Sequence, residues 1–504
     1  MGKRSAPTAK RRVRPARKKS VKKGQVTKTE PLSFSHLPNE IVSIIAQQAL
    51  AVGGHRLLRN FSFTNRRNFE LSQRELYRHV VISYELQLAY LTRSLIENPS
   101  LRRMIRSINL YADYWRCRGG DCDRVFREWP NTPMDESRLS QSDRQLLILS
   151  RSHCNQKASD NIQCVFGLLL FLIDRAKHVA IKIDWYWATL DNFLAAGLAS
   201  STSLSSGSSS GPSFYTALLP VVQTLELSTK HYLQKPVQTI QSKPFHPFKA
   251  LTASTNLRVF NFDGDMNPWS NLDDIDPDMK LPFTTVKLIV SHCTASNLCK
   301  FLRHCPDLQR LNVASQGHAA DSGTEECINT VLPKFCPQIR ELSLRFGGGS
   351  KNFFQSGARI LNCLPEMSSL KELRIEVDSF LMRNTDIGTL KLANKLPEQL
   401  EKLLVDTSFA LTPFPLHGRR MTARSPEAVT YKRAVENMVQ GLCKARKHRF
   451  PRLNTILVGA KYAKPVQWTN TANRTLTRIG ARIKVTSSIE IQRLWTYSWD
   501  EMKV

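Results

Sequence analysis

The chain has 504 residues, of which 41% are hydrophobic and 23% are charged, and its formal net charge is +30. At roughly 100–200 residues per domain, this length indicates two to four domains or one elongated array of repeats. The 11 cysteines are odd in number and irregularly spaced, which is untypical of a secreted disulfide framework and favours a reducing compartment. The longest apolar run, residues 165–173, is too short to span a bilayer, so we expect no membrane association.

The N-terminal segment 1–31 is strongly basic, because twelve Lys and Arg residues precede the first acid, Glu30. A basic segment without aromatic residues cannot bury enough apolar surface to fold, so we expect a disordered tail. Two clusters within it predict a nuclear import signal, with a nonspecific polyanion-binding arm as the alternative: Lys10, Arg11, Arg12, Arg17, Lys18 and Lys19. Since no apolar signal core for secretion is present, we expect the protein in the nucleus, the cytoplasm or both.

Folded structure is predicted to begin at residue 32, where Leu, Ile and helix-forming residues replace Lys and Arg. Pro38 suits the first position of a helix, and Glu40 complements the positive end of the helix dipole. Apolar residues then follow at helical spacing: Ile41, Ile44, Ile45 and Ala49. Gly53-Gly54 ends this helix, a second apolar helical pattern follows, and the β-branched segment 76–82 predicts a first strand.

Five short motifs within residues 32–83 occur in the order and spacing of the F-box, in the version found in filamentous fungi. They are Leu37-Pro38-Asn39-Glu40-Ile41, Ile44-Ile45, Leu57-Leu58, Thr64-Asn65-Arg66-Arg67 and Leu76-Tyr77-Arg78-His79-Val80. The segment therefore resembles a small all-α F-box. It departs from the family at Gly53-Gly54, where a Pro- or Asp-containing turn is frequent, and at Phe63, where a smaller residue is common.

This resemblance implies a partner for the helices. In the family they dock a Skp-type adaptor, which connects to the cullin and RING subunits of an E3 ubiquitin ligase. The residues that would face the adaptor are Leu37, Pro38, Ile41, Ile45, Leu57 and Leu58. The alternative is that they form only the core of an ordinary amphipathic helix. A unit this small has too few internal positions to hide all of its apolar residues, which favours the adaptor interpretation.

A second pattern runs through residues 84–490. Three apolar residues occur at positions i, i+3 and i+5. In the four most regular copies, the last residue of each triplet lies 30 or 31 residues after the last residue of the triplet before it. Ten copies are candidates: Ile105-Ile108-Leu110, His178-Ile181-Ile183, Val222-Leu225-Leu227, Leu257-Phe260-Phe262, Phe283-Val286-Leu288, Leu308-Leu311-Val313, Ile339-Leu342-Leu344, Leu370-Leu373-Ile375, Leu400-Leu403-Val405 and Leu453-Ile456-Val458. Helical spacing precedes several of them, so each unit is predicted to be a helix followed by a short strand.

Stacked units of this kind bury a continuous core and place their strands in a parallel row. The spacing resembles that of leucine-rich repeats, in irregular, helix-rich copies of the kind attached to many F-box proteins. The predicted fold class is α/β, an F-box followed by a leucine-rich-repeat-like solenoid. Cys305 and Cys336 recur at equivalent repeat positions and are predicted to pack in its core.

Three insertions are predicted to interrupt the solenoid. Residues 113–160 are mostly polar, residues 196–214 are rich in Ser and Gly, and residues 412–432 are basic. Insertions in repeat proteins tend to fall on one face, often the face that binds a partner. Residues 491–504 are predicted to form a C-terminal tail.

No catalytic motif is present, so we expect a protein that is not an enzyme and has no cofactor. Four residues could supply the atoms of a zinc site, but they lack tight Cys-x2-Cys pairs, and reduced cysteines in an insertion are the preferred interpretation: Cys117, Cys122, His153 and Cys154. No metal site is therefore predicted. Nucleic acid would bind at most nonspecifically, through the excess positive charge.

The function these features predict is that of a substrate receptor in a ubiquitin ligase of the Skp–cullin–F-box type. Strand alternation predicts outward side chains that would contact a target protein: Arg310, Asn312, Arg340, Ser343, Lys371 and Arg374. Their basic tendency suits an acidic or phosphorylated target. The alternative function is a nuclear repeat scaffold or chromatin-associated protein that binds through the basic tail.

Overall fold

The computed structural model describes residues 37–112, 120–137, 139–155, 157–183, 219–229, 254–264, 280–290, 295–315, 328–345, 361–377, 390–407, 426–460 and 482–487. The chain divides into two compact units, residues 1–73 and residues 74–504. The sequence placed this boundary at residue 83, whereas the structure places it inside a helix. The segments 1–31, 196–214 and 491–504, including the predicted import signal, lie outside the described residues.

The N-terminal unit contains helix α1 (Asn39–Ser62) and the first part of helix α2 (Arg66–Arg78). Helix α1 begins directly after Pro38, and it is kinked at Gly54, whose φ of 62° and ψ of −164° are not helical. A positive φ is open to glycine because it has no Cβ. The predicted break at Gly53-Gly54 is therefore confirmed as a kink between two helical segments. The fully buried apolar residues of this unit are Val42, Ala46 and Leu58.

The second unit alternates strands with helices. Its first half contains β1 (His79–Ile82), α3 (Glu85–Glu97), the 3₁₀ helix η2 (Pro99–Met104), β2 (Ser107–Ala112), α4 (Gly120–Glu128), η3 (Trp129–Asn131), α5 (Gln141–His153), α6 (Ala158–Leu172), β3 (His178–Ile183), β4 (Thr224–Thr229) and β5 (Val259–Gly264). Its second half contains β6 (Thr285–Val290), α9 (Ala295–Arg303), β7 (Arg310–Ser315), α10 (Ile328–Phe335), β8 (Glu341–Arg345), η5 (Leu364–Glu366), β9 (Glu372–Glu376), η8 (Leu392–Lys395), β10 (Lys402–Asp406), α12 (Pro426–Arg449), β11 (Thr455–Ala460) and β12 (Arg482–Ser487).

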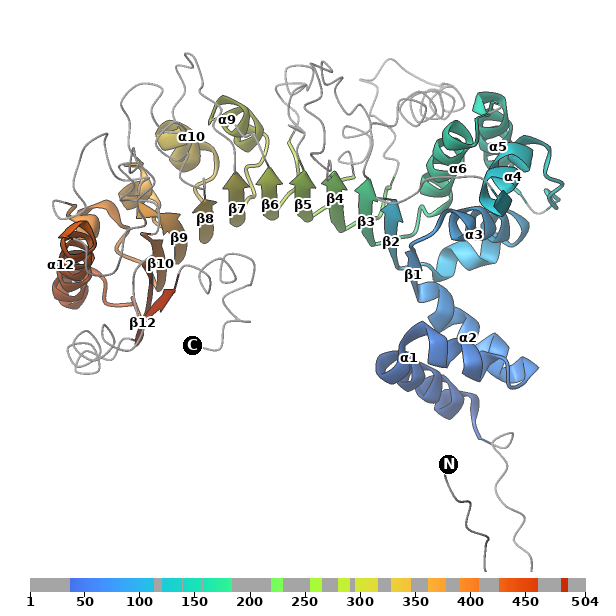
Figure 1. The fold of residues 1–504 in the computed structure, drawn as a ribbon, viewed down its shortest axis with the longest axis horizontal. Helices are drawn as coiled ribbons and strands as arrows, with labels where there is room; N and C mark the ends of the chain where they lie inside the picture. Colours follow the sequence, from blue (N-terminus) through green and yellow to red (C-terminus); the bar gives the residue numbers. More distant parts are fainter. Residues whose placement is uncertain are drawn as a thin grey trace, which may run out of the picture. The chain divides into compact units, whose positions relative to one another are not determined.

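The strands form a single twelve-stranded sheet in which every strand pairs, in parallel, with its neighbours in the sequence (Figure 1). The apolar positions of the repeat lie in register, so that Leu311 pairs with Leu342 and Val313 with Leu344. Each repeat thereby continues the hydrophobic core of the one before it. The unit is a mixed α/β solenoid, as its sequence predicted.

The structure corrects the repeat list at three strands. The sequence identified ten repeat strands and, separately, a strand within 76–82. The structure confirms that strand as β1, places it at one end of the row, and adds β12 at the other end. The third correction is the register of β3, where Val179 pairs with Ile108 and Ile181 with Leu110, two residues away from the predicted alignment. The true triplet begins at Ala176, a small residue that gives a weaker apolar signal, although both Ala176 and Val179 are buried.

Part of the predicted insertion 113–160 is a helical layer rather than a polar excursion. Helices α4 and α5 pack against α6, which also packs against α3. Phe126, Trp129 and Leu147 are buried in this layer. Segment 113–119 lies outside the described residues, as do residues 408–425, and α12 begins at Pro426 within the predicted insertion 412–432.

The core of the solenoid is built from stacked equivalent positions. The Phe260 and Phe283 rings stack at 5.4 Å between centroids, and the Phe283 and Phe301 rings lie 6.1 Å apart. Cys305 and Cys336 are fully buried, which confirms the prediction that they pack in the core. Burial raises the pKa of both thiols, to about 12 for Cys336. These cysteines are therefore neutral packing residues at physiological pH.

Candidate partner-binding surfaces

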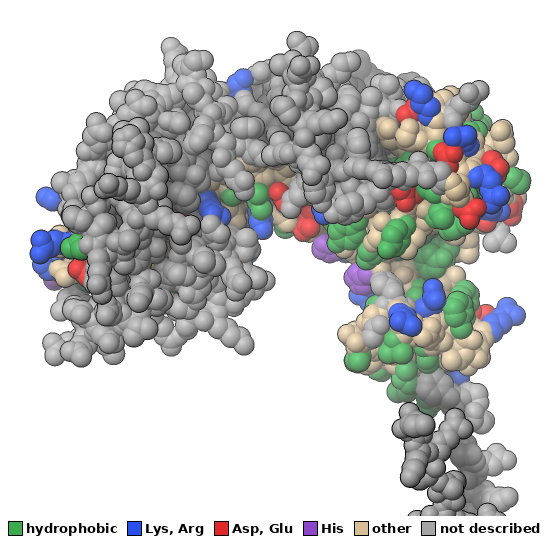
Figure 2. All heavy atoms as spheres, in the orientation of Figure 1, with side chains coloured by type: hydrophobic (Ala, Val, Ile, Leu, Met, Phe, Trp, Pro, Cys, Tyr) green, Lys and Arg blue, Asp and Glu red, His purple; other side chains and the backbone are tan. Residues whose placement is uncertain are grey.

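The N-terminal unit exposes an unusual number of large apolar side chains for its size. They are Ile41, Ile44, Val52, Leu57, Phe63 and Phe69, with exposed fractions between 42% and 83%. Figure 2 shows hydrophobic side chains on the visible face of α1 and α2. We call these six residues the apolar surface of the N-terminal unit. Large exposed apolar patches on soluble proteins generally mark contact sites for other molecules.

The residues predicted to face an adaptor fall into three groups. Pro38, Ile41 and Leu57 are exposed, and Leu37 and Ile45 are half-buried. Leu58 is fully buried, so the structure removes it from any contact surface. The helix that follows the kink at Gly54 turns Leu58 inward and leaves Leu57 outside. The sequence missed the exposure of Ile44, Val52, Phe63 and Phe69, although Phe63 stood out as larger than the residue common at its position.

The motif at residues 64–67 fixes the position of α2 against the start of α1. The Asn68 backbone N–H donates to Asn65 Oδ1 at 2.8 Å, which caps the helix. Arg67 Nε and Nη2 donate to Asn39 Oδ1 at 2.9 and 2.7 Å, and Nη2 also donates to the Leu37 carbonyl. These bonds hold the first turn of α1, which carries Ile41 and is flanked by Pro38, in one geometry.

The outward-facing side of the sheet changes character along the strand row. Its central positions, aligned by strand register, are Val81, Asn109, Ala180, Glu226, Asn261, Lys287, Asn312, Ser343, Arg374, Leu404 and Leu457. From Val81 to Asn312 they are exposed or half-buried, and from Ser343 to Leu457 they are buried. The face is therefore open over β1 to β7 and closed over β8 to β11.

Because the face is closed over β8 and β9, two of the predicted target-binding residues are not accessible to a partner. Asn312 is half-buried, and Arg310, Arg340 and Lys371 are exposed, but Ser343 and Arg374 are buried. A strand covered on both sides has a continuous apolar run instead of alternation. The runs 403–405 and 456–458 carried this signal in the sequence.

Two of the exposed cations already have acidic partners. Arg310 Nε lies 2.8 Å from Glu341 Oε1, and Lys371 Nζ lies 2.9 Å from Glu401 Oε1. Burial raises the pKa of Glu341, with a further contribution from the negative charge of Glu372. Much of the positive charge predicted to attract an acidic target is therefore neutralised within the sheet.

The open end of the strand row offers a different set of side chains. Val81 and Tyr111 are 43% and 39% exposed, and His79 and His178 are exposed beside them on β1 and β3. The next positions along the row are polar, and Asn261 Nδ2 donates to Glu226 Oε1 at 3.0 Å. This end of the row therefore exposes apolar, imidazole and amide side chains together.

The candidate zinc ligands do not form a metal cluster. In the described part of the chain, no group of three or more His, Cys, Asp and Glu side chains could hold a metal ion. His153 Nδ1 lies 3.0 Å from the Leu149 carbonyl, and the pKa of Cys154 is raised, first by a hydrogen bond with Cys164 and then by burial. Cys117 lies outside the described residues.

No protein-family model and no curated protein matches this chain. Among the helices that the structure describes, none combines the length and apolarity needed to cross a bilayer.

Proposed function

We propose that this protein is a nonenzymatic substrate receptor of a ubiquitin ligase. In this proposal the N-terminal unit is an F-box that docks a Skp-type adaptor, and the solenoid is a leucine-rich-repeat-like domain that holds a target protein. The observation that carries the proposal is the apolar surface of the N-terminal unit. Ile41, Ile44 and Leu57 are exposed on α1. Val42, Ala46 and Leu58 of the same helix are buried in the core of the unit.

The energetics favour a partner at this surface. Full burial of an Ile or Leu side chain contributes about 1.5–3 kcal/mol, so the exposed residues of α1 represent a substantial driving force for association. The bonds from Arg67 to Asn39 and Leu37 fix the first turn of α1 before any partner arrives. A surface that is ordered in advance loses less conformational entropy on binding.

The solenoid supplies the second half of the proposed mechanism. Its open face over β1 to β7 would contact the target, in place of the buried positions over β8 to β11. A receptor that holds the target and the ubiquitin donor in one assembly raises their effective concentration, which needs no catalytic residue in the receptor itself.

The test is the affinity of the full chain for a purified Skp-type adaptor. We compare wild type with the double variant Ile41→Asp/Ile44→Asp, because both side chains are exposed and neither belongs to the buried core. The matched control is Ile148→Asp/Val429→Asp, which places the same charges on exposed apolar residues of the other unit. At about 1.4 kcal/mol per tenfold change, the first variant should lose at least about 100-fold in affinity. The control should bind like wild type.

Two results would contradict the proposal. One is the absence of adaptor binding by the wild-type chain, and the other is an equal loss in both double variants.

The twelve cations before Glu30 favour a second candidate function, a nuclear scaffold that holds a polyanion. That function requires polyanion binding that weakens steeply with salt and disappears when residues 1–31 are deleted. Adaptor binding should survive the same deletion.

A further inference from the structure

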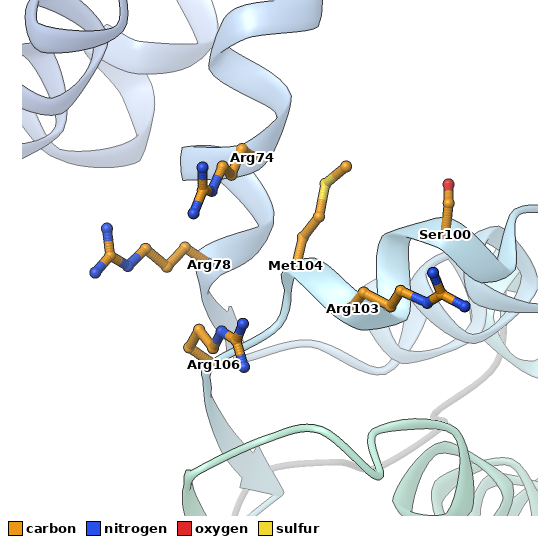
Figure 3. A pocket seen from close by; sticks show the side chains of 6 residues that line it. All are labelled: Arg74, Arg78, Ser100, Arg103, Met104 and Arg106. Atoms are coloured by element: carbon orange, nitrogen blue, oxygen red, sulfur yellow. The ribbon is translucent and has the colours of Figure 1, made fainter.

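A cavity at the start of the solenoid unit is lined almost entirely by arginine. Its volume is about 410 Å³, and its lining residues are Arg74, Arg78, Ser100, Arg103, Met104 and Arg106. They come from three elements, namely the end of α2, the 3₁₀ helix η2 and the residue before β2. In Figure 3, Arg74, Arg78 and Arg106 lie on one side of Met104, and Arg103 and Ser100 lie on the other.

The positive charge of this cavity has almost no counterion. The lining contains no carboxylate, and within the described chain Arg74, Arg103 and Arg106 form no ion pair. Arg78 has one distant partner, with 3.5 Å between its Nη1 and Glu75 Oε2. A guanidinium cannot lose its charge in a protein, so the four cations repel one another at every accessible pH.

Other arginines of the same region are paired, which makes the cavity exceptional. Arg102, the neighbour of Arg103, lies 2.9 Å from Asp143 and donates to the Leu95 carbonyl at 3.1 Å. Arg93 lies 2.7 Å from Glu97. The four cavity cations are exposed to solvent and converge from three elements, which makes the cavity a positively charged site open to a negatively charged ligand.

The backbone around the cavity is held in place. The Arg106 N–H donates to the Arg78 carbonyl at 3.0 Å, which joins the end of α2 to the start of β2. Arg74 and Arg78 are one helical turn apart, about 6 Å along the axis. The ion pair of Arg102 with Asp143 anchors η2 beside Arg103. The backbone segments that carry the four arginines are therefore held in place and do not depend on a single loop.

We propose that this cavity binds a ligand carrying at least two phosphate groups. Arginine is suited to phosphate because its planar fork donates two parallel hydrogen bonds to the oxygens. Because the cations lie on both sides of Met104 (Figure 3), two phosphates on one ligand would engage both groups of arginines. The volume lies within the roughly 300–1,000 Å³ of small-ligand sites. The phosphates could belong to a small free polyphosphate or to a doubly phosphorylated protein segment, and adaptor binding is not part of the argument.

The experiment uses the full chain at about 0.3 M salt, which suppresses contacts with the basic tail. Two probes are titrated by calorimetry: inorganic tripolyphosphate, and a peptide with two phosphoserines. The cavity variant is Arg74→Gln/Arg106→Gln. The control variant is Arg340→Gln/Arg452→Gln, which loses the same charge from exposed positions elsewhere. We expect saturable binding of at least one probe by wild type and by the control, and a loss of at least tenfold in the cavity variant.

The two probes identify the source of the phosphates. Binding of tripolyphosphate supports a small free ligand, and binding of the phosphopeptide alone supports a modified protein segment. Three results would overturn the proposal: no saturable binding of either probe, equal weakening in both variants, or binding of citrate or a two-glutamate peptide as tight as that of the phosphates. A second variant, Arg103→Glu, tests the opposite wall and should also abolish binding.

Discussion

Charged side chains are arranged differently in two regions of the solenoid unit, namely β8 to β10 and the cavity at its start. Over β8 to β10 the charges are buried or half-buried, and cations on the neighbouring strands flank the paired glutamates Glu341 and Glu372. Around the cavity at the start of the unit, four cations gather, and Glu75 forms an ion pair with one of them, Arg78. The difference shows that strand register brings cations beside Glu341 and Glu372, whereas the cavity collects like charges from separate elements.

Register explains the balance over the later strands. Arg310, Glu341, Glu372 and Lys402 occupy the same aligned position of β7 to β10. The first pair lies 2.8 Å apart, and the last pair 2.7 Å. Arg374 is buried two residues further along β9, where Glu372 and Glu341 favour its charged form although burial lowers its pKa. Glu341 and Glu372 thus have Arg310, Arg374 and Lys402 as nearby cations.

The largest effect should follow from breaking this balance. Arg374→Ala leaves the two glutamates without their buried cation, and breaking one side of a buried pair costs about 3–5 kcal/mol. Urea unfolding followed by circular dichroism measures the loss. Arg340→Ala removes an exposed arginine next to the same strands and should change the unfolding free energy by less than about 0.5 kcal/mol. Similar losses in both variants would show that burial of Arg374 has no such role.

The next effect concerns a buried acid that has no counter-charge, the thiol of Cys336. Burial raises its pKa from 9.0 to about 12, so the folded chain keeps this proton while the unfolded chain loses it. Stability should therefore fall as pH rises from about 9 towards 12, by about 1.4 kcal/mol per pH unit for this one group. At pH 10.5 the ionisation of Cys336 in the unfolded chain should lower the unfolding free energy by about 2 kcal/mol.

Comparison with Cys336→Ala isolates this contribution. The variant should be less stable than wild type at pH 8, because the substitution leaves a small cavity, but it should lose less stability between pH 8 and pH 10.5. Unfolding free energies at both pH values provide the measurement. Parallel pH profiles would mean that Cys336 ionises as readily in the folded chain as in the unfolded one.

These contrasts also define how much the sequence could predict. The solenoid was predictable because stacked repeats place apolar residues at a fixed spacing. The predicted register was wrong where that spacing was weak, as at Ala176 before β3. The exposure of Ile41 and Leu57 was predictable from a short helix with too many apolar residues. The inward turn of Leu58 depends on the backbone at Gly54, which residue spacing does not encode.

The arginine cavity lay beyond sequence reasoning for a related reason. Arg74 and Arg78 share a helix, but Arg103 and Arg106 come from a 3₁₀ helix and a loop that follow 25 or more residues later. Only the parallel pairing of β1 with β2 brings these segments together. In a chain with 72 Lys and Arg residues, four scattered arginines carry no signal until the fold is known.

A smaller effect should separate an arginine that joins α2 to the start of α1 from one whose partner is an exposed residue of its own helix. Arg67→Ala removes the bonds to Asn39 and Leu37 and should weaken the start of α1 by about 1–2 kcal/mol. Arg66→Ala removes only an exposed pair with Glu70, 3.0 Å long, and should cost less than about 0.5 kcal/mol. Hydrogen exchange of the α1 amides reports this local opening. Equal protection in both variants would contradict the assigned role of Arg67.

The smallest effect, and the one that completes the comparison, belongs to the cavity arginines. Arg103→Gln and Arg74→Gln should change the unfolding free energy by no more than about 0.5 kcal/mol without ligand, and in the stabilising direction, because each removes a repulsion. With tripolyphosphate at about 100 times its dissociation constant, wild type should gain about 2.7 kcal/mol and the variants less. Destabilisation of the ligand-free variants would instead assign these arginines to the fold. A cluster that costs stability when empty and returns it when occupied behaves as a binding site.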